Sequence, residues 1–419
     1  MFFTSPARNN VRILVLFAVA LGLIIPFTAC NRRRVHDAPP SYGRPYLTWQ
    51  NDPATTMTIT YHSEEKPDSV VALYDIVSDP ESYHFRAEGE SWQIPGLPDG
   101  RYINSVELTG LAPGKDHYFR IGDGEEFSQE YKFRTLPDDN TPMRFAIGGD
   151  TLATRLFRDL IREVAAKDPL FLVIGGDLSY ADGRFERIGR WNAWFDHWHE
   201  EAVTSDGRLI PLVLAIGNHE TNDLDGTHEE RAPFFFGFFP QGGKTYWAHQ
   251  YGGNMGLIVL DTNHLVPHKE QVSFLEEKLQ AYQDLPFATA VYHVPFYPSF
   301  RSFDCEYSVA GREHWLPLFD AYEVDVGFEN HDHTFKRTKR LRNNEVDPEG
   351  TLYVGDGNAG VPPRRPKCGR WYMEKTAQTP HFWIVDVSDS EMELQALDRR
   401  GRYFDAVTVR SRAKHGDTP

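Results

Sequence analysis

The segments "MRFAIGGD" (residues 143–150) and "LFLVIGGDLSYAD" (residues 170–182) each run through apolar residues into the same ending, Gly-Gly-Asp. Between them, residues 156–169 place apolar side chains at helical spacing. An apolar strand, a helix and a second apolar strand are typical of a layered α/β domain, in which helices cover the faces of a sheet. These segments therefore predict a domain of that class.

The same pattern recurs further along the chain. Apolar runs break into polar residues within residues 209–220, 255–264 and 287–297, and the alternating stretch 381–410 predicts strands that complete the domain. We expect an α/β sandwich with mixed sheets flanked by helices over residues 141–411. Such sheets place their ligand sites at the carboxyl ends of strands. The polar residues at those ends are therefore the candidates for function.

The region before this domain has a different character. Residues 56–63 alternate strictly, residues 101–122 contain two strand-like runs around a Pro-Gly turn, and no helical period is visible. We predict a small β-sandwich over residues 44–136, followed by a polar linker that contains prolines. The predicted fold class is therefore α+β with two domains.

The first 30 residues have the features of an export signal: a positive start, an apolar run over residues 13–25 and small residues before Cys30. The run is shorter than the ~20 residues that a membrane-spanning helix needs. Residues 27–30 resemble a bacterial lipobox, in which the cysteine is lipidated, although Phe27 replaces the usual leucine. An ordinary secretory signal and an uncleaved anchor are the alternatives. Residues 31–43 predict a tether, so we expect an exported protein that is membrane-anchored or secreted.

The composition narrows the class of partner. The 419 residues are 40% hydrophobic and carry a net charge of −16, which is ordinary for a globular protein but disfavours nucleic-acid binding. A small phosphorylated substrate held locally by metals is compatible with this charge. In an oxidising compartment, Cys305 and Cys368 could form a disulfide. The sequence does not show whether they lie close together, and the pairing stays open.

Polar side chains of metal-binding type follow five apolar strands in order: Asp150, Asp177 with Tyr180, Asn218 with His219, His293, and His331 with His333. Any single block can be explained without a function, for example as a turn that ends a strand or as a core histidine whose hydrogen bonds are all made. Five in succession are hard to explain by packing. Side chains at i and i+2 of an extended strand share a face. We therefore expect the last two histidines to leave one strand end on the same side.

The number of donors predicts two metals. Excluding His219, the set has seven side chains, which exceeds one protein site with an open position. If Asp177 bridges, each metal has three further ligands. A two-metal centre suits in-line displacement at phosphorus, because the metals stabilise the attacking and leaving oxygens and lower the pKa of a bound water.

These blocks resemble the purple acid phosphatases, within the calcineurin-like metallophosphoesterases. The resemblance rests on residues 149–152, 176–180, 217–220, 290–293 and 330–333, and the tyrosine is its most specific mark. Segments of residues 44–122 resemble the family's N-terminal fibronectin-III-like domain, and residues 349–360 resemble its late strand and turn. The resemblance covers roughly residues 44–410.

The resemblance implies a role for each residue. Asp150, Tyr180 and His333 would bind Fe(III), and Asn218, His293 and His331 a divalent metal (Zn, Fe or Mn), with Asp177 as the bridge. His219 would be catalytic with Asp177, by hydrogen-bonding the substrate phosphate. A helix-start or packing role is the alternative for His219.

The chain departs from the family pattern at four places, of which Ala290 for valine is slight. Leu152 and Asn330 replace glycines, which permit left-handed backbone without strain; Asn is the next best tolerated there. The loop after the fourth block lacks the plant enzymes' histidines and offers other polar residues instead: Arg301, Asp304, Glu306, Arg312 and His314. Arg301 is our candidate for substrate binding, and the leaving-group acid is unassigned.

The sequence thus favours an exported binuclear acid phosphatase that hydrolyses phosphomonoesters through a metal-activated water. A phosphodiesterase or nucleotidase on the same centre is the first alternative. A catalytically impaired cell-surface binding protein is the second, and the presence of all seven ligands argues against it.

Overall fold

The computed structural model describes residues 43–411. The predicted export signal, Cys30 and nearly all of the tether lie outside the described residues. Within residues 43–411, none of the helices has both the length and the apolar character needed to span a bilayer.

Eight strands form the N-terminal β-sandwich, in two antiparallel sheets of four. The first has the order β1 (Tyr46–Thr48), β2 (Met57–Ser63), β6 (Tyr102–Leu108), β5 (Glu90–Trp92). The second has the order β4 (Phe85–Glu88), β3 (Val71–Asp75), β7 (Asp116–Gly122), β8 (Tyr131–Arg134). The Pro-Gly turn therefore connects two strands in different sheets.

Two mixed sheets form the second domain. One has the order β11 (Leu212–Leu214), β10 (Leu172–Ile174), β9 (Met143–Gly148), β20 (His381–Val387), β21 (Glu391–Asp398), β22 (Tyr403–Arg410). The other has the order β12 (Trp247–Tyr251), β13 (Met255–Val259), β14 (Phe287–Val291), β15 (Val326–Glu329), β18 (Thr351–Gly355), β16 (Phe335–Arg342), β17 (Glu345–Val346), and β19 (Met373–Ala377) also pairs with β16. Strands β9 to β11 are parallel, as are β13 to β15 and β18.

Seven α-helices are assigned in the described residues: α1 (Arg155–Ala165), α2 (Ile188–Glu201), α3 (His228–Arg231), α4 (Pro233–Phe238), α5 (Val272–Ala281), α6 (Glu306–His314) and α7 (Leu316–Ala321). Single 3₁₀ turns cover Phe185–Arg187, Asn218–Glu220 and His268–Gln271. Helix α1 begins after Thr154, whose hydroxyl accepts a hydrogen bond from the Phe157 N–H.

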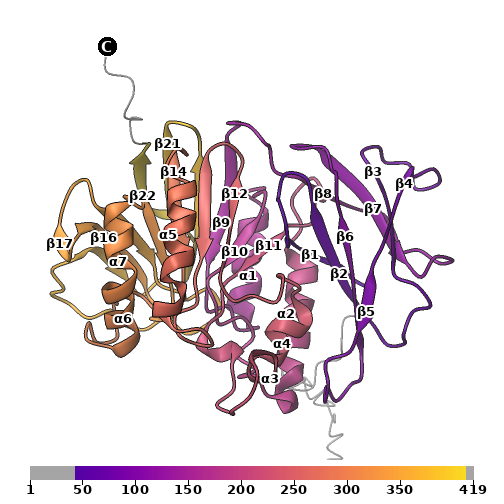
Figure 1. Ribbon diagram of the computed structural model, residues 1–419, viewed down its shortest axis with the longest axis horizontal. Coiled ribbons are helices and arrows are strands. Elements are labelled where there is room, and N and C mark those ends of the chain that lie inside the picture. Colours follow the sequence, from indigo (N-terminus) through magenta and orange to yellow (C-terminus); the bar gives the residue numbers. More distant parts are fainter. Residues whose placement is uncertain (1–42, 412–419) are drawn as a thin grey trace, which may run out of the picture. The chain divides into compact units, whose positions relative to one another are not determined.

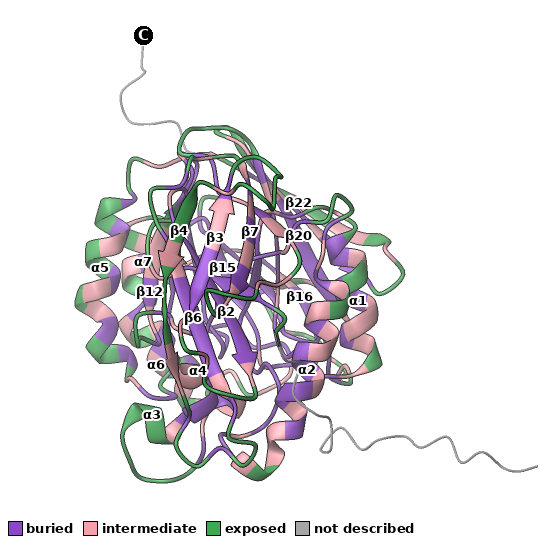
Figure 2. Cartoon of the chain, turned by 90° about the vertical axis from the view of Figure 1, so that its right-hand side faces the viewer, coloured by how far each residue is buried: buried purple, intermediate pink, exposed green. Residues whose placement is uncertain are grey.

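Successive side chains of a strand face opposite sides of its sheet, so each sheet contributes to two core layers. On β9, Phe145 and Ile147 face a core shared by the two sheets, whereas Ala146 faces the core under α1 and α2. Ile258 of β13 likewise faces the core under α5 and α7. Figure 2 shows α1 and α5 on opposite sides of the strands, each with its buried face inward, and Figure 1 shows the same elements along the chain. The structure confirms the predicted two-domain α+β fold.

The two cysteines within the described residues are both free thiols. Cys305 precedes α6 and is partly buried, and Cys368 is exposed in the loop before β19. The structure therefore does not support a disulfide between them.

Candidate metal centre

The backbone at the carboxyl edge of the strands adopts an uncommon conformation. Five of the seven predicted ligands have a positive φ: Asp150 (56°), Asp177 (56°), Tyr180 (62°), His331 (76°) and His333 (59°). A left-handed conformation costs a non-glycine residue about 1–2 kcal/mol, and such residues cluster at functional sites. Each of these side chains is therefore aimed by a tight turn that follows its strand.

This geometry corrects our expectation for the His-x-His block. Strand β15 ends at Glu329, so His331 and His333 lie in a turn and do not share the face of an extended strand. Asn330 and Leu152 are not among the residues with positive φ. The glycines that they replace are therefore not required for left-handed backbone at these positions.

The side chain of Asn330 instead explains one glycine in each of the two Gly-Gly-Asp endings. A Cβ atom on Gly149 would lie 2.4 Å from Asn330 Oδ1, and one on Gly175 would lie 1.9 Å from Asn330 Nδ2. The same amide nitrogen donates to the carbonyl of Tyr292 at 3.1 Å. Only glycine lets the turns after β9 and β10 approach this amide so closely.

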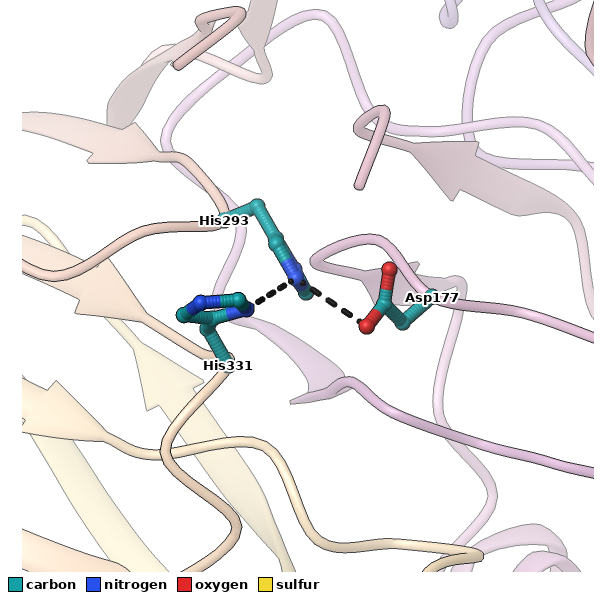
Figure 3. A group of neighbouring side chains, drawn as sticks. All are labelled: Asp177, His293 and His331. Carbon is teal, nitrogen blue, oxygen red and sulfur yellow. Dashed lines mark hydrogen bonds and ion pairs between the residues drawn. The ribbon is translucent and has the colours of Figure 1, made fainter. Parts of the chain in front are cut away.

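The first group of donors contains Asp177, His293, His331 and Asn218. Asp177 Oδ2 lies 3.2 Å from His293 Nε2, and the same Nε2 lies 3.0 Å from His331 Nδ1 (Figure 3). Asn218 Oδ1 lies 3.3 Å from this nitrogen. Ligand atoms of Asp177, His293 and His331 all fall within 4.8 Å of one another, as a metal site requires.

The second group contains Asp150, Tyr180, His333 and again Asp177. The Tyr180 hydroxyl donates to Asp150 Oδ1 at 2.9 Å and lies 3.2 Å from His333 Nε2, which is itself 2.9 Å from Asp150 Oδ1. Ligand atoms of Asp150, Asp177 and His333 lie within 4.8 Å of one another. The structure thus brings all seven side chains together, in two groups that share Asp177, with His331 and His333 in different groups.

The hydrogen bonding around His293 shows that the first group fits a cation. His293 Nδ1 lies 2.9 Å from the Gly175 carbonyl, which only accepts, so this nitrogen carries the proton. Nε2 then faces oxygens of Asp177 and Asn218, and without a metal it can carry a second proton in the place of a cation. Burial lowers the pKa of His293, but the Asp177 carboxylate outweighs it and raises the pKa to about 9. The site therefore attracts positive charge.

His219 lies beside the two groups and outside both. Its ring packs on Tyr180 with a centroid separation of 4.1 Å, and the backbone N–H of His219 donates to Asp177 Oδ1 at 2.8 Å. Its Nδ1 is hydrogen-bonded to Asp182, which forms an ion pair with Arg187. The side chain is 34% exposed, with Nε2 4.0 Å from Asp177 Oδ2. This matches a substrate-facing imidazole better than a metal ligand.

Sequence reasoning missed the residues that hold these turns in place. Asp182 ends the same polar run as Tyr180, which was the available signal. Glu220 is buried and accepts the backbone N–H groups of Asp177, Leu178 and Gly217 at 2.7–2.8 Å. Burial, followed by the charge of Asp177, raises the pKa of Glu220 to about 7.

A sixth polar strand end also reaches the site. His264 follows β13, and its ring centroid lies 5.5 Å from that of His293. Asp261 accepts the backbone N–H of His264 at 2.7 Å and so shapes this turn. Residues 255–264 were recognised as a strand with a polar end, but neither side chain was singled out.

Arg301 is tied to the His-x-His turn. Its guanidinium donates to the carbonyl of His331 and to Asp332 Oδ1, the latter at 3.1 Å. Asp332 is buried and also accepts the Phe300 N–H at 2.6 Å. Arg301 therefore braces the turn that carries the two histidines, and its side chain is 30% exposed.

Comparison with known proteins agrees with this architecture. Residues 43–135 match the N-terminal domain of purple acid phosphatases, and residues 143–335 match the calcineurin-like phosphoesterases. The solved purple acid phosphatase PPD1 from yellow lupin has the same fold, with a TM-score of 0.74 at 18% identity over 89% of this chain and 75% of the lupin chain. The fold and the site thus define a calcineurin-like phosphoesterase.

The curated relatives narrow the family. Purple acid phosphatase 23 of Arabidopsis thaliana is 28% identical over 295 residues, covering 62% of this chain and 62% of the relative. Purple acid phosphatase 15 of the same plant is 26% identical over 288 residues, covering 62% of this chain and 53% of the relative. The chain belongs to the purple acid phosphatase family. The matched region spans less than two thirds of the length of these two relatives.

Proposed function

We propose that this protein is an exported binuclear-metal phosphatase that hydrolyses small phosphomonoesters. The observation that carries the proposal is the membership of Asp177 in both donor groups, which are otherwise separate. One carboxylate shared between two groups is the arrangement that a bridged metal pair needs. A pair of bound cations would supply charge stabilisation for the phosphate and lower the pKa of a water.

We propose that Asp150, Tyr180 and His333 hold Fe(III), because a phenol is a ligand for a strongly charged ion. Asn218, His293 and His331 would hold a divalent metal (Zn, Fe or Mn). Burial, and then the Asp150 charge, keep the pKa of Tyr180 above its usual value. A phenolate in this site therefore requires a cation beside it.

The chain's own groups would orient the phosphate. Asp182 accepts the Nδ1 proton of His219 and fixes its ring on Tyr180. When the ring carries a proton on both nitrogens, Nε2 can then donate to a phosphate oxygen. The left-handed turns hold the donors in place before substrate binds, so little reorganisation is required.

Metal content and turnover test this proposal together. We expect two metal ions per chain, hydrolysis of p-nitrophenyl phosphate, and a violet to pink colour from the phenolate on ferric iron. Tyr180→Phe should bleach the colour. A colourless wild type with full iron occupancy would contradict the assignment of Tyr180 as an iron ligand. Faster turnover of bis(p-nitrophenyl) phosphate than of the monoester would favour a phosphodiesterase instead.

Export and membrane tethering rest on the sequence alone. We propose that Cys30 becomes the lipidated N-terminus of the mature chain. Mass spectrometry of protein purified from its native membrane should show a mature chain that begins at Cys30 and carries lipid mass. A chain that is intact or cleaved elsewhere contradicts this.

A further inference from the structure

One loop beside the candidate centre differs in charge from the rest of the molecule. We call residues 361–372 the basic loop. They include four cationic residues and no acidic one, in a chain whose net charge is −16. The cationic residues are Arg364, Arg365, Lys367 and Arg370.

Backbone contacts hold the basic loop against the turns that carry the candidate ligands. The Gly360 N–H, just before the loop, donates to the Asp150 carbonyl at 2.8 Å, and the Arg364 N–H donates to the His333 carbonyl at 2.7 Å. Further along, the Lys367 N–H donates to the Ser299 carbonyl at 2.9 Å. Three prolines, at positions 362, 363 and 366, restrict the backbone between these contacts. The loop is therefore fixed beside the Asp150 group.

Among the residues that the structure describes, the Arg364 side chain makes no direct ion pair, although the charges of Asp332 and Asp150 act on it from beyond ion-pair distance. Its guanidinium carbon lies 5.2 Å from the centroid of the Phe300 ring, and the side chain is partly buried. Within residues 43–411, no carboxylate forms an ion pair with it and no side chain or carbonyl accepts a hydrogen bond from its guanidinium. Arg301, by contrast, is neutralised by Asp332.

The electrostatics of this position favour an incoming anion. A planar guanidinium matches the oxygens of a phosphate group and binds them through paired, charge-assisted hydrogen bonds. The reacting phosphate would already be held by the metals and His219. This leaves the Arg364 guanidinium available for a second anionic group of the same substrate.

We propose that Arg364 binds a second phosphate group on the substrate, so that the protein prefers phosphomonoesters whose leaving group is itself phosphorylated. This inference rests on the proposed function, because it places the reacting phosphate at the candidate metal centre. It assigns specificity to the basic loop, which lies outside the metal ligands.

Binding of non-hydrolysable analogues tests the inference without turnover. Isothermal titration of metal-loaded protein would compare 1,4-phenylene bisphosphonate with phenylphosphonate. Because hydrogen bonds between charged groups are strong, we expect wild type to bind the bisphosphonate about tenfold more tightly. Arg364→Gln should remove most of this preference, and Arg364→Lys should retain part of it.

Arg365→Gln is the matched control, since it removes the same charge from an exposed neighbour on the same loop. It should keep the preference. The inference is overturned if wild type shows no preference, if Arg364→Gln weakens both ligands equally, or if Arg365→Gln acts as strongly as Arg364→Gln. Melting curves and metal content of each variant identify any that fail to fold.

Kinetics then separate this inference from the proposed function. With 1,4-phenylene bisphosphate and phenyl phosphate, Arg364→Gln should lower the ratio of kcat/KM values about as much as it lowers the binding preference. If metal-loaded wild type hydrolyses neither ester but still prefers the bisphosphonate, the proposed function fails and the binding site stands. If it hydrolyses both with equal kcat/KM and shows no binding preference, the proposed function stands and the inference fails.

Discussion

Two buried polar clusters lie at the ends of neighbouring strands, and they are built in opposite ways. One is the candidate metal centre around Asp150 and Asp177. The other, which we call the lysine cluster, consists of Lys336 on β16, Glu329 on β15 and Asp356 after β18, all fully buried. Both concentrate charge in the protein interior, where an unpaired charge is costly.

The lysine cluster contains its own cation. Lys336 forms an ion pair with Glu329, lies with its Nζ 3.3 Å from Asp356 Oδ2, and donates to the Tyr297 carbonyl at 2.8 Å. Glu329 also accepts hydrogen bonds from the Tyr292 hydroxyl and the Phe296 N–H. Burial holds the pKa of Asp356 well above its usual range, which favours its neutral form. The cluster therefore balances its charge internally.

The candidate metal centre does not balance its charge within the chain. Within residues 43–411, the cationic side chains at ion-pair distance from Asp150 and Asp177 are histidines alone. His293 and His333 each point Nε2 at a carboxylate oxygen, at 3.2 and 2.9 Å, which is the arrangement of ligands around a cation bound from outside the chain. The difference teaches that a buried ionic cluster is structural when it is complete, and that an incomplete one marks a binding site.

The largest effect should come from removing the shared carboxylate. We expect Asp177→Ala to lose both metals and all measurable phosphatase turnover, because it alone belongs to both donor groups. His219→Ala should keep both metals, with turnover reduced about 10–100-fold, as is typical for a lost hydrogen bond beside a metal. Metal analysis and p-nitrophenyl phosphate assays measure both. If His219→Ala loses metal as completely as Asp177→Ala, our division between ligands and substrate contacts is wrong.

Breaking the lysine cluster should instead cost stability. Lys336→Met leaves Glu329 charged and unpaired, which should lower the free energy of unfolding by about 3–5 kcal/mol. Adding Glu329→Gln should recover part of this loss. Lys339→Met is the control on the same strand, since Lys339 is only partly buried and donates to a carbonyl. Equal losses of stability in urea denaturation of the two lysine variants would show that the cluster is not the cause.

Adding a side chain that crowds the candidate centre should lower metal occupancy more than it lowers the stability of the fold. Gly357 has a φ of 55°, and a Cβ atom there would lie 1.7 Å from Asp150 Oδ2. Gly357→Ala should displace this carboxylate and lower metal occupancy. Gly369→Ala is the matched control, because Gly369 also has a positive φ (78°) but nothing lies within 4 Å of its Cβ position. Both variants should share a backbone cost of about 1–2 kcal/mol. Full metal occupancy in Gly357→Ala would contradict the close approach.

The smallest effect should come from weakening the hydrogen bond between Asp182 and His219. Asp182→Asn should keep both metals and lower kcat about tenfold, while KM changes little, because the amide no longer accepts the Nδ1 proton as a charged partner. Asp223→Asn is the control, since the Asp223 side chain is fully exposed. A loss of metal in Asp182→Asn would mean that this residue supports the ligand turns themselves.

Much of the molecule was predictable from its sequence. Alternation and apolar runs identified the two domains, because the side chains of a strand point to opposite faces and each face must be buried or exposed. The seven donors were found because each follows an apolar run, and the carboxyl ends of parallel strands meet at one edge of a sheet.

Other features depended on the tertiary structure. The sequence could not show that Asn330 fills the space above Gly149 and Gly175, that Lys336 supplies the cation for Glu329, or that the basic loop lies on the His333 turn. These contacts join residues far apart in the chain, and no local spacing encodes them. The sequence by itself determined which chemical groups would gather at the sheet edge. The family resemblance also implied how they divide into two groups. Only the folded chain showed what produces that division, because it depends on left-handed turns whose geometry is set by the loops packed against them.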